Sequence, residues 1–178
     1  MYGVAKGKSF ARRTYLLMRR YRVNKRVQTE HPFPFTEKDA FLITYGDQFR
    51  REGEAPLETL TAFLGERCGG WISGVHILPF FPYSSDDGFS VIDYYTVSKA
   101  VGRMSDIERI ANSYALMADL VCNHCSAQGE WFQGFLAGRR RYRYFFIVED
   151  KKADWSRVMR PRTTPLFTSF VTRDGEVS

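Results

Sequence analysis

The sequence predicts an α/β fold in which a parallel sheet is covered by helices. Three short apolar runs, within residues 40–45, 74–78 and 114–122, have the length and composition of buried strands. The two segments between these runs carry apolar residues at helical spacing. Strands that are apolar on both faces and alternate with helices are typical of parallel sheets, because helices cover the faces of such sheets.

The first strand is expected at residues 41–45, where Gly46-Asp47 ends the apolar run. The helix after it begins near Pro56, a residue suited to the first helical turn, and ends near Gly65. Its apolar residues are Leu57, Leu60, Ala62, Phe63 and Leu64. We expect it to be the first of the covering helices.

The second strand is expected at residues 74–78, where Pro79 ends the run because proline cannot donate to a sheet. The following segment, residues 80–96, is rich in aromatic residues, proline, serine and aspartate. It shows neither helical nor alternating periodicity. It is therefore expected to be a long loop of the kind that often carries function.

A second helix is expected to begin at Ser105, because Ser105 and Glu108 have the spacing of a capping box. The third strand, at residues 116–122, then leads directly into the polar pair Asn123-His124. Beyond it, a short amphipathic helix around Trp131 precedes irregular polar sequence. This succession of elements begins both a doubly wound sheet and a (β/α)8 barrel, and periodicity does not separate the two.

The net charge of +6 comes entirely from the N-terminus. Residues 1–26 contain nine Lys or Arg and no acid, whereas the remainder contains 17 basic and 20 acidic residues. A short amphipathic helix is expected at about residues 9–21, lying outside a domain with its arginines solvated. A transit peptide, an anionic membrane surface and nucleic acid are the alternatives for this segment. The second basic run, residues 139–143, is expected to be a solvated loop, and we expect neither nucleic acid nor a membrane as partner.

The three cysteines, Cys68, Cys122 and Cys125, are an odd number in a chain without a secretory signal or a membrane-spanning apolar run. We therefore expect reduced thiols and a cytoplasmic location. Cys122 and Cys125 enclose Asn123-His124, a pattern that resembles a zinc or redox motif. The pair does not open a helix and lacks a second ligand pair at finger-like spacing, so no metal site is expected.

Two clusters of polar residues follow predicted strands, at the edge where parallel α/β folds assemble their sites. The first lies in the loop after the second strand, where Asp86 and Asp87 stand beside Gly88 and Phe89. A carboxylate that accepts hydrogen bonds from hydroxyls, next to an aromatic face, can bind a sugar ring. The alternative is an aspartate-rich turn whose carboxylates cap backbone amides.

The second cluster lies at the end of the third strand. If the strand continues to this point, Asp119, Val121 and Asn123 point to one side, and His124 lies in the following loop. A buried aspartate needs hydrogen-bond partners, which we expect Asn123 and His124 to supply. A binding site and a polar cluster that only holds the loop are equally compatible with this pattern.

The run from Asp119 to His124 resembles the first signature motif of the α-amylase superfamily (glycoside hydrolase family 13), an Asp, three mostly apolar residues and Asn-His. Residues 75–94 are similar to the strand-two loop of the sucrose phosphorylase group, particularly its branch acting on glucosylglycerate and sucrose phosphates. Residues 42–47 and 161–168 also match that group. The resemblance implies the first three β/α units of a (β/α)8 TIM barrel and the start of an excursion after strand three.

The resemblance also implies roles for particular residues. Asp86 and His124 would hydrogen-bond the glucosyl unit on the donor side of the scissile bond, and Phe89 would form an apolar wall there. Asp119 and Asn123 would support the floor of that subsite. The chain would divide into a basic helical extension, the first part of the barrel and the start of an inserted subdomain, at residues 1–36, 37–125 and 126–178 respectively.

The activity implied is that of a retaining hexosyltransferase that passes an α-glucosyl unit from a disaccharide donor to inorganic phosphate, with no metal or organic cofactor. Retention needs two carboxyl groups about 5 Å apart, and in the family these lie on later strands. We therefore expect this chain to be an N-terminal portion that is inactive alone. The alternative is a non-catalytic carbohydrate-binding or basic interaction module, and the DNA beyond codon 178 would distinguish the two.

Overall fold

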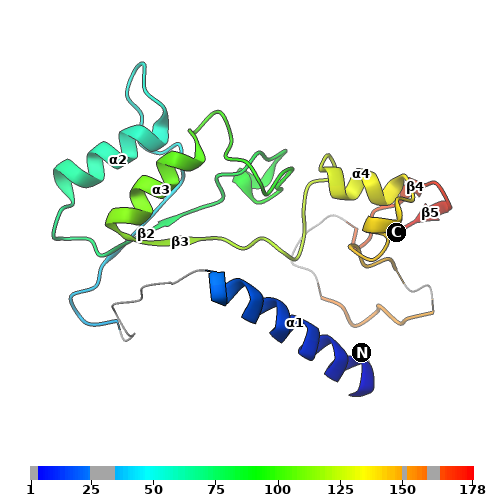
Figure 1. Ribbon diagram of the computed structural model, residues 1–178. Helices are drawn as coiled ribbons and strands as arrows, with labels where there is room; N and C mark the ends of the chain where they lie inside the picture. The colour runs from blue at the N-terminus through cyan, green and yellow to red at the C-terminus, as the bar shows by residue number, and fades with distance from the viewer. Residues whose placement is uncertain (1–3, 25–34, 150–151, 160–164) are drawn as a thin grey trace. The chain divides into compact units, whose positions relative to one another are not determined.

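The structure is a computed structural model that describes residues 4–24, 35–149, 152–159 and 165–178. It comprises two compact units, Met1–Thr36 and Glu37–Ser178. Within the described residues, the first unit consists of helix α1 (Val4–Asn24), which is longer at both ends than expected (Figure 1). No helix within the described ranges combines the length and apolarity needed to cross a membrane.

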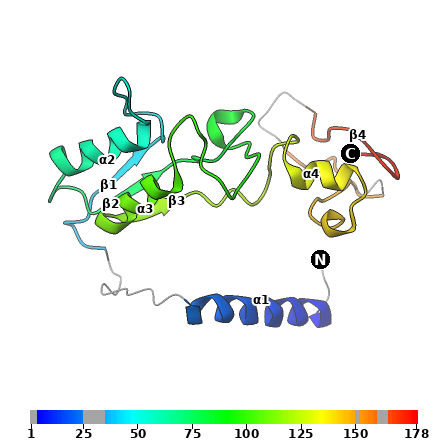
Figure 2. The same cartoon turned by 45° about the horizontal axis from the view of Figure 1, so that its top comes forward.

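The second unit is built on a three-stranded parallel sheet, whose strands are labelled in Figure 2. Its strands are β1 (Phe41–Thr44), β2 (Gly74–Ile77) and β3 (Ala115–Ala118), and β2 lies in the middle. Both neighbouring strands pair with all four residues of β2 in parallel register. The prediction of three parallel strands in sequence order is therefore confirmed.

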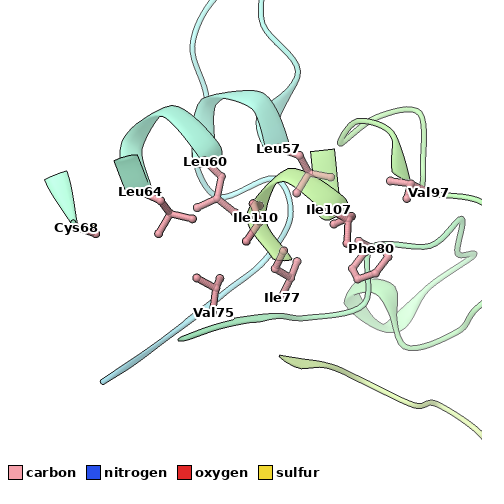
Figure 3. Packing of buried hydrophobic residues seen from close by; sticks show 10 residues of the cluster. All are labelled: Leu57, Leu60, Leu64, Cys68, Val75, Ile77, Phe80, Val97, Ile107 and Ile110. Carbon is pink, nitrogen blue, oxygen red and sulfur yellow. The ribbon is translucent and has the colours of Figure 1, made fainter. Parts of the chain in front are cut away.

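Helices α2 (Pro56–Arg67) and α3 (Met104–Ser113) cover the same face of this sheet (Figure 1 and Figure 2). Val75 and Ile77 of β2 point toward these helices and are fully buried, as Figure 3 shows. The buried core consists of Leu57, Leu60, Leu64, Cys68, Val75, Ile77, Phe80, Val97, Ile107 and Ile110. Full burial of one such aliphatic side chain stabilises the fold by about 1.5–3 kcal/mol, so this layer fixes the sheet on its helices.

The other face of the sheet is largely uncovered by the described residues. Ile43 is 63% exposed and Met117 is 47% exposed. Both lie in one row with His76, because the register places Ile43 and Met117 opposite it. The expectation of strands buried on both faces is thus correct for one face only, since α2 and α3 pack on the same side.

The third strand ends at Ala118, four residues earlier than the expected end at residue 122. Among the described residues, its pairing partner is β2, which ends at Ile77 shortly before Pro79. Within the ranges that the structure describes, residues beyond Ala118 therefore have no neighbouring strand to pair with. The expected alternation of Asp119, Val121 and Asn123 along a strand is wrong for this reason.

Helix α3 begins at Met104 rather than after a Ser105 cap, with Arg103 as the N-cap residue. The carboxylate of Asp106 accepts a hydrogen bond from the backbone N–H of Arg103 at 2.8 Å, so Asp106 closes the first turn in place of Glu108. Asp106 is 2% exposed and also contacts Arg109. A buried carboxylate needs these partners, whereas the exposed Glu108 does not.

The remainder of the second unit holds α4 (Glu130–Leu136), the short 3-10 helix η2 (Arg140–Tyr142) and a hairpin of β4 (Phe170–Thr172) with β5 (Gly175–Val177). Helix α4 confirms the expected amphipathic helix. The hairpin was not expected, although its Asp174-Gly175 dipeptide is a known hairpin signal. The arginines of the second basic run are exposed, as predicted.

Candidate functional site

The loop after β2 folds into a narrow hairpin whose tip exposes two carboxylates. Tyr83 and Val91 form an antiparallel bridge between its two arms. Backbone hydrogen bonds also join the arms on either side of this bridge, from Ser84 to Ser90 and from Ile92 to Pro82. The tip is the short 3-10 helix η1 (Asp86–Gly88). The side chains of Asp86 and Asp87 are exposed there, so both carboxylates are available to a ligand.

The tip of this loop has an uncommon backbone conformation. Asp86 and Asp87 have φ angles of 60° and 49°, a left-handed region that disfavours residues with a Cβ atom by about 1–2 kcal/mol each. Gly88 follows with a φ of 100°, and a Cβ atom there would lie 2.7 Å from the carbonyl oxygen of Pro79. Strain of this kind persists only where the surrounding fold enforces it, and it is frequent at binding sites.

The carboxylate of Asp119 meets an imidazole from the neighbouring strand. Its Oδ2 atom lies 3.0 Å from Nε2 of His76, with the two side chains 27% and 17% exposed. The expectation that Asn123 and His124 would partner Asp119 is therefore wrong. The register places His76 opposite Met117, so Asp119 follows two residues later on the same side. His76 was not among the site residues expected from the sequence, where its only signal is a polar residue between the buried Val75 and Ile77.

Asn123 and His124 instead bond to each other. Nδ2 of Asn123 lies 2.6 Å from Nδ1 of His124, and both side chains are exposed. With the amide in this orientation, Nδ1 is the acceptor, so the neutral ring carries its proton on Nε2. His124 thus presents an N–H donor that can reach a hydroxyl or phosphate oxygen.

Hydrogen bonds tie the loop after β2 to the segment after β3. The hydroxyl oxygens of Ser84 and Ser126 lie 2.7 Å apart, and Ser126 is 1% exposed. The N–H of Ser126 donates to the carbonyl of Val91 at 2.8 Å, and the hydroxyl of Tyr94 donates to the carbonyl of Val121 at 2.7 Å. The segments that carry Asp86 and His124 are therefore parts of one hydrogen-bonded assembly.

Two hollows adjoin these segments. Asn123 and His124 line one of about 690 Å³, together with aromatic side chains that include Phe132, Phe146 and Phe167. Such a mixture of aromatic walls and a few polar groups is typical of small-molecule sites.

The other hollow, of about 600 Å³, is lined by Tyr45, Asp47 and Asp87 among others. Asp86 and Phe89 line neither hollow, and no hydrogen bond among the described residues joins them to His124. The described structure thus brings together Asn123 with His124 and Asp119 with His76, and leaves Asp86 and Phe89 at the tip of their loop.

Burial raises the pKa of two ionisable side chains beside His124, Cys125 and Tyr94. Burial raises the pKa of the Cys125 thiol, which therefore stays protonated at neutral pH. Burial raises the pKa of Tyr94, and the negative charge that Cys125 and Cys122 would carry once ionised raises it further. Within the described ranges, no group of three His, Cys, Asp or Glu residues could hold a metal ion.

A family match decides how this arrangement is classified. Residues 71–169 match the family described as "Alpha amylase, catalytic domain", a span that covers more than half of the chain. The chain belongs to the α-amylase family. The matched span of this α-amylase family chain contains β2, its loop, β3 and the run Asp119–His124.

Among curated proteins, this family member is similar to phosphorylases. It is 56% identical to the glucosylglycerate phosphorylase of Allomeiothermus silvanus over 142 residues, which are 80% of this chain and 26% of that protein. It is 34% identical to the sucrose 6(F)-phosphate phosphorylase of Thermoanaerobacterium thermosaccharolyticum, over 76% of this chain and 29% of that protein. The chain therefore spans about a quarter of the length of these relatives.

A solved structure gives the same classification. The crystal structure of sucrose 6F-phosphate phosphorylase from Thermoanaerobacter thermosaccharolyticum matches with a TM-score of 0.66 and 30% identity, over 81% of this chain and 31% of that one. The α-amylase catalytic fold is a (β/α)8 barrel, so the parallel sheet and its two helices are a part of such a barrel rather than of a doubly wound sheet.

Proposed function

We propose that this α-amylase family chain is part of a disaccharide phosphorylase that transfers an α-glucosyl unit from a donor sugar to inorganic phosphate. The observation that carries the proposal is the 56% identity to a glucosylglycerate phosphorylase over 142 residues, which are 80% of this chain. Because the chain spans only 26% of that relative, the activity belongs to a protein of the relative's length.

In this proposal the chain supplies one part of the barrel. Residues 37–125 form its first three β/α units, and residues 126–178 begin a subdomain inserted after the third strand. Residues 1–36 are an extension that takes no part in the sugar site. The strand order and the position of the polar residues after β2 and β3 support this division, since barrel enzymes build their sites from the loops at these strand ends.

The donor glucose is bound by a hydrogen-bond acceptor, a hydrogen-bond donor and an apolar side chain. The Asp86 carboxylate accepts hydrogen bonds from sugar hydroxyls, and the Nε2–H of His124 donates one. Phe89 supplies an apolar wall. Asn123 positions the His124 ring through its hydrogen bond with Nδ1. Asp119 positions the start of the Asp119–His124 run through its contact with His76. The contact between His76 and Asp119 replaces the joint support of the subsite floor by Asp119 and Asn123 that was expected from the sequence.

The covalent chemistry requires two further carboxyl groups, one acting as nucleophile and the other as acid and base, about 5 Å apart. We assign neither role to any carboxylate of these residues. The contribution of Asp86 and His124 is to bind the sugar more tightly as it flattens toward the oxocarbenium-like transition state, which lowers the barrier rather than only the Kd.

The test is a chimera in which residues 1–178 of this chain are joined to the remainder of the Allomeiothermus silvanus glucosylglycerate phosphorylase. Phosphorolysis of glucosylglycerate, sucrose and sucrose 6-phosphate is measured through release of glucose 1-phosphate. We expect activity, and we expect Asp86→Ala and His124→Ala each to lower kcat/KM by about 100-fold or more, with kcat falling at least as much as binding.

The matched control is Asp87→Ala, which removes the adjacent carboxylate of the same strained loop tip. We expect it to retain most of the activity, because Asp87 lines the other hollow. If Asp86→Ala and His124→Ala retain the parent rate, the residue assignments are wrong. If the folded chimera shows no phosphorolysis of any of the three donors, the proposed activity is wrong.

A further inference from the structure

Helix α1 carries basic side chains along one wide side. Lys8, Arg12 and Arg19 are spaced by one and by two helical turns, and Arg13 and Arg20 are spaced by two turns beside them. All five side chains are exposed. The helix contains no acidic residue, so these cations have no ion pair within it.

The opposite side of α1 is apolar. At 3.6 residues per turn, Ala11 and Met18 lie about 20° apart around the helix and Leu17 lies about 100° from Met18, so these apolar side chains span about one third of the circumference. Leu17 is 55% exposed and Met18 is 56% exposed. Tyr15, Leu16, Leu17 and Met18 are adjacent in sequence. The helix separates them by turning Leu16 onto the basic side.

A surface that satisfies both sides of α1 must combine negative charge with an accessible apolar layer. Nucleic acid would pair the arginines but leave Leu17 and Met18 in water. An apolar protein groove would bury the stripe but provide nothing for the cations. We propose that α1 binds an anionic lipid bilayer, lying in the interface with Leu17 and Met18 among the acyl chains and its arginines among the head groups.

The second arginine run of the chain lacks this combination. Arg139, Arg140, Arg141 and Arg143 lie at and beside a 3-10 helix of three residues. The aromatic residue within the run, Tyr142, is 3% exposed, and its hydroxyl donates to Glu130 at 2.8 Å. The arginines of this run are exposed at a density similar to that on α1, but they do not lie on an amphipathic helix. The run is therefore an internal control.

The proposal goes beyond the sugar chemistry and departs from the expectation that the protein has no membrane partner. It assigns residues 1–36 a location rather than a catalytic role. The binding step involves no group of the proposed donor site, so α1 and the sugar site can be tested independently.

The experiment is flotation of the chimera, which carries residues 1–178 of this chain at its N-terminus, with lipid vesicles in a density gradient, which separates vesicle-bound protein from aggregates that stay below. Vesicles of phosphatidylcholine alone are compared with vesicles of phosphatidylcholine and phosphatidylglycerol in equal parts. We expect about tenfold more protein to float with the anionic vesicles, and this excess to be lost at high salt.

Two variants of α1 test its two sides. Leu17→Glu with Met18→Glu should abolish the anionic-specific flotation, and so should the change of Arg12, Arg13, Arg19 and Arg20 to Gln. Two matched controls should float like the parent: Leu120→Glu with Leu166→Glu, which changes exposed leucines elsewhere, and the change of Arg139, Arg140, Arg141 and Arg143 to Gln.

Equal flotation with neutral and anionic vesicles would overturn the proposal, as would an equal loss in the control variants. Retained flotation of the Leu17→Glu, Met18→Glu variant would show that charge alone acts. In that case binding of the same variant to duplex DNA at low salt would identify nucleic acid as the partner instead.

Discussion

The contact between His76 and Asp119 joins two strands at the level where the polar residues of the site begin. Both side chains are less than one third exposed, and each is the other's hydrogen-bond partner. His76 lies on the face of the sheet that α2 and α3 do not cover. The pair therefore holds the start of the Asp119–His124 run against β2, which fixes where His124 can lie.

We expect a measurable coupling energy between these two residues. In the chimera, a double-mutant cycle of His76→Ala and Asp119→Ala should give about 1–2 kcal/mol in the free energy of unfolding measured with urea, because a partly buried hydrogen bond to a charged group is worth that much. The control is the pair of Asp47 and Arg50, whose atoms lie 2.6 Å apart with side chains 49% and 71% exposed. Its coupling should stay below about 1 kcal/mol, and an equal coupling in both pairs would contradict the role given to His76.

The thiol of Cys125 provides a pH-dependent test of the packing beside His124. Burial raises its pKa in the folded protein, so its thiolate forms at higher pH than in the unfolded chain. The rate of alkylation by iodoacetamide, followed for Cys125 by peptide mass spectrometry, should therefore rise at higher pH in the folded chimera than in urea. The corresponding stability is present below the ordinary thiol pKa and is lost as pH rises through the folded value. Coincident profiles in the two states would contradict the buried position of Cys125.

Helix α4 and the 3-10 helix η2 pack closely against each other because Gly134 of α4 has no Cβ atom. A Cβ atom on Gly134 would lie 2.2 Å from the ring of Tyr142, and that ring is held by its hydroxyl on Glu130. Burial and this hydrogen bond make Tyr142 the anchor of the segment after α4. Hydrogen bonding to the Glu130 carboxylate also raises the pKa of Tyr142, which is consistent with a phenol that donates rather than accepts.

Gly134→Ala should destabilise the chimera by about 1–3 kcal/mol in urea unfolding, because the added methyl group overpacks the contact. Gly65→Ala is the matched control, since Gly65 is also helical and its Cβ would meet no atom within 4 Å. That change should instead raise stability by up to about 1 kcal/mol through helix propensity. In a Tyr142→Ala background, Gly134→Ala should lose its penalty, and persistence of the penalty there would show that the ring is not its cause.

At the scale of the whole molecule, the sheet is covered on one side only by the described residues. Exposed apolar side chains, including Ile43 and Met117, lie on its other face, and β1 and β3 are its two outer strands within the described part of the chain. Apolar faces and open strand edges promote association between chains. In a full barrel these same surfaces form the interior and the contacts to neighbouring strands.

We therefore expect residues 1–178, expressed alone, to associate or to form a molten state that binds the dye ANS and shows weak near-ultraviolet circular dichroism. The same preparation should release no glucose 1-phosphate from glucosylglycerate, sucrose or sucrose 6-phosphate, because binding groups do not replace a nucleophile and a proton donor. The chimera is the positive control for both measurements. A sharp cooperative melt with strong near-ultraviolet dichroism would contradict the first expectation, and turnover would contradict the second.

The sequence by itself determined the elements whose signals are local. Short apolar runs placed β1 and β2, and helical spacing of apolar residues placed α2, because both signals are visible within a dozen residues. Proline and glycine marked the ends of these elements and the long loop after β2. The Asp119–His124 run indicated the family without any structure, since that pattern depends on residue types rather than on contacts.

Only the tertiary structure decided which residues meet. Asp119 pairs with a histidine 43 residues earlier because β2 and β3 are in register, and no local pattern contains that register. The early end of β3 has the same origin, since an edge strand stops where its neighbour stops. Asp106 replaced Glu108 as the closing residue of α3 because its position is buried, and burial is set by the helix and sheet that pack around it.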